Sequence, residues 1–157
     1  MGLDINAYKN LKIVEKPELD EDGYVLNWDS EWMSGESMVW SETHFPGRGE
    51  GVNPHTVYTW EDRYRFRAGS YSGYNWWRRA LKQFAKGNDF HELIEFADNE
   101  GVIGSVVSKK LANDFAKNLE EAVEFAGHLE SEVWLELYND WKKAFEMASN
   151  NGAVEFC

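Results

Sequence analysis

Apolar residues recur at steps of three and four positions along two stretches in the second half of the chain. The first stretch covers residues 105–126 and the second covers residues 129–150. This spacing puts the apolar side chains on one face of a helix, and that face must be buried against another layer. Gly127 and the pair Asn151-Gly152 follow as helix stop signals. We therefore expect two long amphipathic helices, preceded by a shorter one over residues 74–86.

The first half of the chain carries strand signals. Residues 3–8 and 64–67 alternate apolar and polar side chains, which is typical of a strand with one buried face. Residues 24–28 and 57–60 are further strand candidates, rich in aromatic and β-branched side chains. Residues 43–54 contain three glycines and two prolines, which predicts a loop.

Strands followed by helices predict an α+β fold, in which an N-terminal antiparallel sheet carries long C-terminal helices on one face. At 157 residues we expect a single domain over 1–157. Within it, 1–70 should be mainly strands and loops and 71–152 mainly helical. The tail 153–157 alternates again and is a candidate edge strand.

The composition narrows the functional class. A net charge of −12 disfavours direct binding to nucleic acid or to anionic membranes, because both need a basic surface. We expect no membrane span and no signal peptide, since the chain has neither a run of 18 apolar residues nor a basic start followed by an apolar segment. The single cysteine, Cys157, permits no internal disulfide, which fits a cytoplasmic protein.

The arginines are segregated from the lysines. All six arginines fall within residues 48–79, which contain no lysine and three acids, so this window carries a charge of +3. The rest of the chain holds ten lysines and 25 acids, a charge of −15. The planar arginine fork binds carboxylate or phosphate through two hydrogen bonds and stacks on flat rings. The window also holds eight aromatic residues, so it favours an anion attached to a ring, such as a nucleotide.

The stretch "RFRAGSYSGYNWWRR" at 65–79 is the centre of this prediction. A strand would deliver arginines, a turn of small residues would expose backbone N–H groups, and a helix would present aromatic rings. A second loop, residues 98–100, offers two acids and an amide that would accept hydrogen bonds from hydroxyl groups. The predicted ligand-binding residues are Arg48, Arg65, Arg67, Ser70, Tyr71, Ser72, Tyr74, Asn75, Trp77, Asp98, Asn99 and Glu100.

Structural alternatives stand beside this hypothesis. Arg63, Arg65 and Arg67 also fit the solvent face of a strand that pairs with acids on its neighbours. The serines fit a capped turn, and residues 98–100 fit a turn before a helix capped by Ser105. We expect no cofactor and no metal, since the four histidines form no metal-binding motif. His44 and His55 flank the glycine-rich loop and would suit an acid–base pair in a nucleotide-degrading phosphodiesterase or lyase.

Several segments resemble a group of small proteins encoded by phages and prophages. They are the opening Met-Gly-Leu-Asp-Ile-Asn-Ala-Tyr, Phe45-Pro46-Gly47-Arg48, residues 66–75, Asp98-Asn99-Glu100-Gly101 and residues 152–156. The resemblance spans most of the chain and transfers no catalytic residue. It implies a host-takeover or anti-defence factor acting in the bacterial cytoplasm.

Three functional hypotheses follow. The leading one is a non-enzymatic protein that sequesters a small anionic, nucleotide-like ligand and so removes an immune signal. The second is an acidic inhibitor whose helices occupy a basic site on a host defence protein. The third is an enzyme that degrades the same nucleotide. Aromatic residues near 76–84 and 134–145 are candidates for a homodimer contact.

Overall fold

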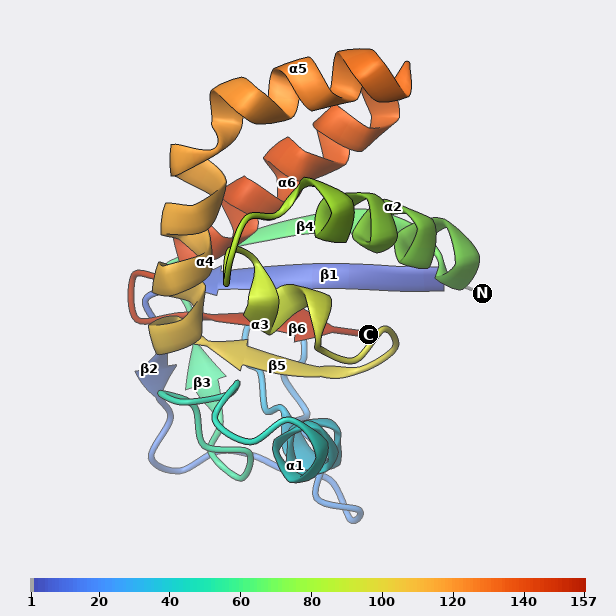
Figure 1. Cartoon of the computed structure of the whole chain (residues 1–157). Helices are drawn as coiled ribbons and strands as arrows, with labels where there is room; N and C mark the ends of the chain where they lie inside the picture. Colours follow the sequence, from blue (N-terminus) through green and yellow to red (C-terminus); the bar gives the residue numbers. More distant parts are fainter. Residues whose placement is uncertain (1) are drawn as a thin grey trace.

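The computed structural model describes residues 2–157 and is built around a four-stranded antiparallel sheet with strand order β4-β1-β6-β5 (Figure 1). Its strands are β1 (Gly2–Lys9), β4 (Asp62–Ser70), β5 (Gly101–Gly104) and β6 (Ala153–Phe156). A second, two-stranded sheet pairs β2 (Lys12–Ile13) with β3 (Tyr58–Thr59). The helices are α1 (Gly35–His44), α2 (Tyr71–Phe84), α3 (His91–Ile94), α4 (Ser105–Lys117), α5 (Leu119–Leu129) and α6 (Glu132–Ala148).

The four-stranded sheet separates two environments. Helices α2, α4 and α6 lie on one side of it, whereas α1 and the β2–β3 pair lie on the other (Figure 1). Side chains alternate along β1, so Leu3, Ile5 and Ala7 enter the helical core while Asn6 and Tyr8 point to the opposite face. We call that opposite side the open face.

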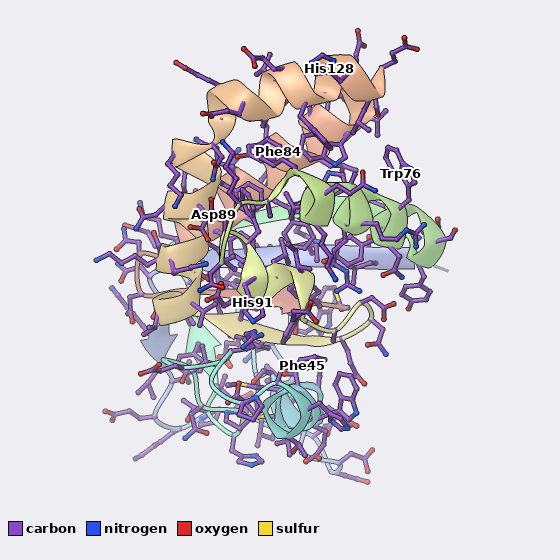
Figure 2. The ribbon with its side chains drawn as sticks, viewed as in Figure 1. Phe45, Trp76, Phe84, Asp89, His91 and His128 are labelled. Carbon is purple, nitrogen blue, oxygen red and sulfur yellow. The ribbon has the colours of Figure 1, made fainter. Side chains whose placement is uncertain are left out.

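Large aromatic side chains fill the helical core. Trp77 of α2 and Trp134 of α6 stack with ring centroids 6.1 Å apart, and each indole N–H donates to the other residue's backbone carbonyl. This reciprocal pair satisfies both buried indole nitrogens, which would otherwise cost stability. Phe84 at the end of α2 contacts Phe125 and Trp134, and so joins α2 to the α5–α6 hairpin (Figure 2).

The α+β prediction is confirmed, with a sheet on one side and long helices packed on one face. The predicted edge strand at 153–157 is wrong, because β6 is an interior strand. Val154 faces Ala7 of β1 on one side and Ile103 of β5 on the other. Burial explains this position, since Ala153, Val154 and Phe156 are each at most 1% exposed, a pattern that an edge strand rarely shows.

The helical prediction for 105–126 needs one correction. The chain breaks at Asn118, whose side chain donates to the backbone carbonyl of Asp114 and to the carboxylate of Asp89. An amide that bonds to the preceding turn competes with the helical hydrogen bonds, and α5 starts there in a new direction. The N-terminus of α6 matches a capped start, since the Ser131 hydroxyl accepts from the N–H of Trp134.

Two elements were not predicted and one predicted strand is wrong. Helix α1 shows almost no separation of apolar and polar faces, and β5 is only four residues long and fully buried. Residues 24–28 form no strand, because Val25 makes a single bridge to Leu19. Within residues 2–157, no helix combines the length and apolar character needed to cross a membrane.

Candidate functional site

A cavity of 380 Å³ lies on the open face of the sheet, where segment 24–33 crosses it. Strands β1, β4 and β6 supply one side and segment 24–33 supplies the other. The lining residues are Asn6, Tyr8, Tyr24, Val25, Trp28, Asp29, Glu31, Trp32, Met33, Arg63, Arg65 and Glu155. The cavity therefore combines aromatic rings, two arginines and three acids.

Strand register brings three polar residues into one row across the sheet. Asn6 lies opposite Arg65 of β4 and also opposite Glu155 of β6. Neighbouring strands are about 4.8 Å apart, so Arg65 and Glu155 stand about 10 Å apart at the level of the backbone. The row gives the cavity a cationic end at the sheet edge and a carboxylate end towards the sheet centre.

Glu155 is held from two sides. Its Oε2 accepts a hydrogen bond of 2.7 Å from the indole N–H of Trp32, and its Oε1 accepts one of 3.3 Å from the side-chain amide of Asn6. Burial raises the pKa of the Glu155 carboxyl above its usual range, while these two donors and the nearby Arg65 act in the opposite direction. Glu155 is thus a positioned, largely desolvated acceptor.

Aromatic rings form the sides and the mouth of the cavity. Tyr8 stacks on Trp32 with ring centroids 4.8 Å apart and contacts Trp60 at 5.0 Å. Tyr24 and Trp28 stand at the mouth, where they are 67% and 78% exposed. Exposed large aromatic side chains beside a cavity provide flat surfaces on which a ring can stack.

The two lining arginines differ from their neighbour Arg67. The Arg67 guanidinium binds both carboxylate oxygens of Asp4, at 3.1 and 3.0 Å. Arg65 is exposed and forms no salt bridge with any acid in residues 2–157. Arg63 lies over the ring of Trp60 at 5.2 Å and is likewise without a carboxylate partner in this part of the chain. Arg65 and Arg63 can therefore accept an external anion.

Two buried oxygens at this cavity lack donors. Asn6 is 8% exposed, and its Oδ1 has no hydrogen-bond partner among the described residues. The same holds for Oε2 of Glu31, on the opposite wall. A buried acceptor without a donor costs about 1–3 kcal/mol, so both positions favour a ligand that brings donors.

The strand-to-helix turn at 65–75 has the shape that the sequence predicts. Gly69 takes a φ of +128°, which suits glycine, at the irregularity where the β1–β4 register shifts. Ser70 then caps α2, because its hydroxyl accepts from the N–H of Gly73 and lies 3.3 Å from the Ser72 hydroxyl. This contact is the capped-turn alternative raised from the sequence.

The aromatic residues after this turn lie mostly inside the protein. Tyr74 and Trp77 are 0% exposed and stack on one another within the helical core, so neither ring reaches a surface ligand. Tyr71 is half-buried. Trp76 is the exposed exception at 44%, and it points away from α2 (Figure 2). Trp134, proposed for a homodimer contact, is also fully buried.

The turn and the loop at 98–100 do meet in space. The Asn75 amide donates to the Asp98 carboxylate at 2.9 Å, and Arg78 donates to the Asn75 side-chain oxygen at 2.8 Å. Asn99 is exposed and Glu100 half-buried beside this contact. Arg48 lies elsewhere and donates from Nε to the backbone carbonyl of Glu92. Of the twelve predicted residues, only Arg65 lines the cavity on the open face.

Sequence reasoning missed most of this cavity. Asn6, Tyr8 and Glu155 stand at strand positions whose side chains face away from the helical core, and this alternation was the signal in the sequence that could have located them. Trp28, Glu31 and Trp32 belong to an irregular segment that carries no periodic pattern. Neither His44 nor His55 lines the cavity. Over residues 2–157, no three histidine, cysteine or acidic side chains gather as metal ligands would.

The chain was compared with known proteins at three levels. No family model, curated protein or solved structure matches it.

Proposed function

We propose that the protein binds a small organic anion carrying a flat ring, with a nucleotide as the preferred chemistry, in the cavity on the open face. The observation that carries the proposal is Arg65, an arginine without an acidic partner within residues 2–157 of an acidic protein, in a cavity with stacked aromatic rings. Arg65 and Arg63 would hold the anion through charge-assisted hydrogen bonds. Trp28 and Tyr24 would stack on the ring.

The proposed role is sequestration. Together with the resemblance to phage-encoded proteins, binding of a nucleotide favours a factor that withdraws an immune signal inside the bacterial host. Rigid rings and forked cations give most of the affinity at few positions, which suits tight retention of a scarce ligand.

The test is calorimetric titration with nucleoside monophosphates and cyclic dinucleotides, followed by denaturation and chromatography of the released ligand. Arg65→Ala should lower the affinity about tenfold or more, because it removes hydrogen bonds to a charged group. Arg79→Ala is the matched control, since Arg79 is an exposed arginine on α2 outside the cavity. Return of intact ligand supports sequestration, whereas altered ligand would show an enzyme, and no uptake would overturn the proposal.

A second candidate function rests on α5. Glu120, Glu121 and Glu124 are exposed there, and none forms a salt bridge in the described part of the chain. Such a surface would suit a basic groove on a host defence protein. Binding through it should weaken steeply with salt and should be lost when the three glutamates become glutamines, with Arg65→Ala without effect.

A further inference from the structure

The two ends of the cavity fit different chemical groups of a ligand. Arg63 and Arg65 lie on β4, the edge strand, whereas Glu155 lies on β6, two strands further in. An anion therefore fits at the outer end. The inner end offers acceptors, because both Glu155 oxygens retain a free lone pair and Asn6 Oδ1 has no donor within residues 2–157.

Segment 24–33 adds a further acceptor to the inner end. Oε2 of Glu31 is buried and lacks a donor among the residues that the structure describes. Trp32, the next residue, is 6% exposed and directs its indole N–H to Glu155, so this part of the segment lies against β6. Three acidic or amide side chains thus surround the inner end: Asn6 and Glu31 each have a buried oxygen without a donor in residues 2–157, and Glu155 can accept hydrogen bonds beyond the two it already receives.

We propose, building on the proposed function, that the inner end recognises a guanine base through its two adjacent donor nitrogens. Guanine presents a ring N–H beside an exocyclic amino group on one edge, which suits a bidentate carboxylate such as Glu155. Adenine and cytosine place a ring acceptor beside their amino group, and uracil has one N–H between two carbonyls. These three bases would set an acceptor against Glu155 or leave it unpaired.

Geometry supports the same orientation. The spacing of about 10 Å between β4 and β6 suits a nucleoside monophosphate laid across β1, with phosphate at Arg65 and base edge at Glu155. The exposed ring of Trp28 would then cover the base from the solvent side. The ligand class is a guanine nucleotide with at least one free phosphate charge.

The experiment compares the affinities of GMP, IMP and AMP for the full chain. IMP keeps the ring N–H of guanine but lacks its amino group. GMP should bind about tenfold or more tightly than either, since each lost hydrogen bond to a charged acceptor has an effect of at least that size. Glu155→Gln should reduce the preference to within about threefold, because an amide offers only one acceptor oxygen. Glu136→Gln, an exposed change on α6, should keep it.

The outcomes separate the two proposals. Equal affinities for the three nucleotides, all dependent on Arg65, would overturn guanine recognition and leave the proposed function standing. A preference for AMP would do the same. No binding of any nucleotide would overturn both. If Glu155→Gln does not fold, Glu155→Asp replaces it, because its shorter side chain moves the carboxylate away from the base edge, and an unchanged GMP preference in that variant would contradict the inference.

Discussion

Arg65 and Glu155 lie on the same face of the sheet with Asn6 between them, and they form no salt bridge in the described chain. Two residues further along β4 and β1, Arg67 and Asp4 do pair, at 3.0 Å. Of these two arginines on β4, Arg67 is thus neutralised by a carboxylate on β1, whereas Arg65 remains available to an external anion. Glu155 is likewise a half-buried carboxylate that forms no salt bridge within residues 2–157.

The burial of Glu155 makes a prediction about stability and pH. Its pKa is raised in the folded state, so the folded protein holds a proton there more tightly than the unfolded chain, and the contribution of Glu155 to stability falls as pH rises above about 4.5. Glu155→Gln removes this effect and should be more stable than the parent protein at pH 7.5. Its advantage should shrink as the pH is lowered to 4.

Urea unfolding of both proteins at several pH values measures the difference in their free energies of unfolding. The effects of the carboxylates that both proteins share cancel in that difference. Glu124→Gln should show no such trend. An advantage for Glu155→Gln that grows towards pH 4 would contradict the burial argument.

Two glycines offer a matched test of the packing. A Cβ at Gly152 would lie 1.8 Å from the backbone carbonyl oxygen of Tyr8, whereas a Cβ at Gly127 meets nothing within 4 Å. Gly152→Ala should therefore cost about 3 kcal/mol or more, since backbone must move. Gly127→Ala on exposed helix α5 should stabilise by about 0.5–1 kcal/mol. Thermal or chemical unfolding gives both values, and equal effects would mean that β6 is not packed against β1 as described.

Arg67 should matter less than Arg65 for ligand binding. Its guanidinium is already engaged by Asp4, and both side chains are about half exposed. Arg67→Ala should change stability by at most about 1 kcal/mol and affinity by at most about fivefold. Titration of the same nucleotide into Arg65→Ala and Arg67→Ala compares them directly. A larger loss of affinity from Arg67→Ala than from Arg65→Ala would place the anion at Arg67, nearer the C-terminal end of β4.

Substitution of Trp28 should lower nucleotide affinity without affecting folding. Because its ring is 78% exposed, Trp28→Ala should alter the free energy of unfolding by no more than about 0.5 kcal/mol. Loss of a stacking surface should nevertheless lower nucleotide affinity about fivefold or more. Trp76→Ala, which removes an exposed tryptophan from α2, is the control and should leave binding intact. Equal affinities of the two variants would exclude Trp28 from the site.

The periodic parts of the sequence predicted the fold well. Helical spacing located α2, α4 and α6, and alternation located β1 and β4, because each of these elements has one apolar face turned to one core. The break at Asn118 depends on side-chain bonds to Asp89 and Asp114, and these become visible only when α3 and α4 are packed together. Strand order likewise depends on contacts between distant segments.

The site was less predictable than the fold. The arginine window at residues 48–79 drew attention to Arg65, yet it also suggested Tyr74 and Trp77, whose rings are completely buried in the helical core. Sequence reasoning could not separate core aromatics from surface aromatics within one short helix. It could not place Arg65 and Glu155 in one row either, since both lie opposite Asn6 of β1, and β1 and β6 come from opposite ends of the chain.

Titration of the ¹⁵N-labelled protein with GMP, followed by amide chemical shifts, shows directly whether a nucleotide binds in the cavity on the open face. The largest shifts should fall on β1, β4, β6 and segment 24–33, near Asn6, Arg65 and Glu155, and Arg65→Ala should need about tenfold or more GMP to reach them. Shifts centred instead on the turn at 70–75 and the loop at 98–100 would contradict the cavity as the binding site. An unchanged spectrum at millimolar GMP would contradict nucleotide binding altogether.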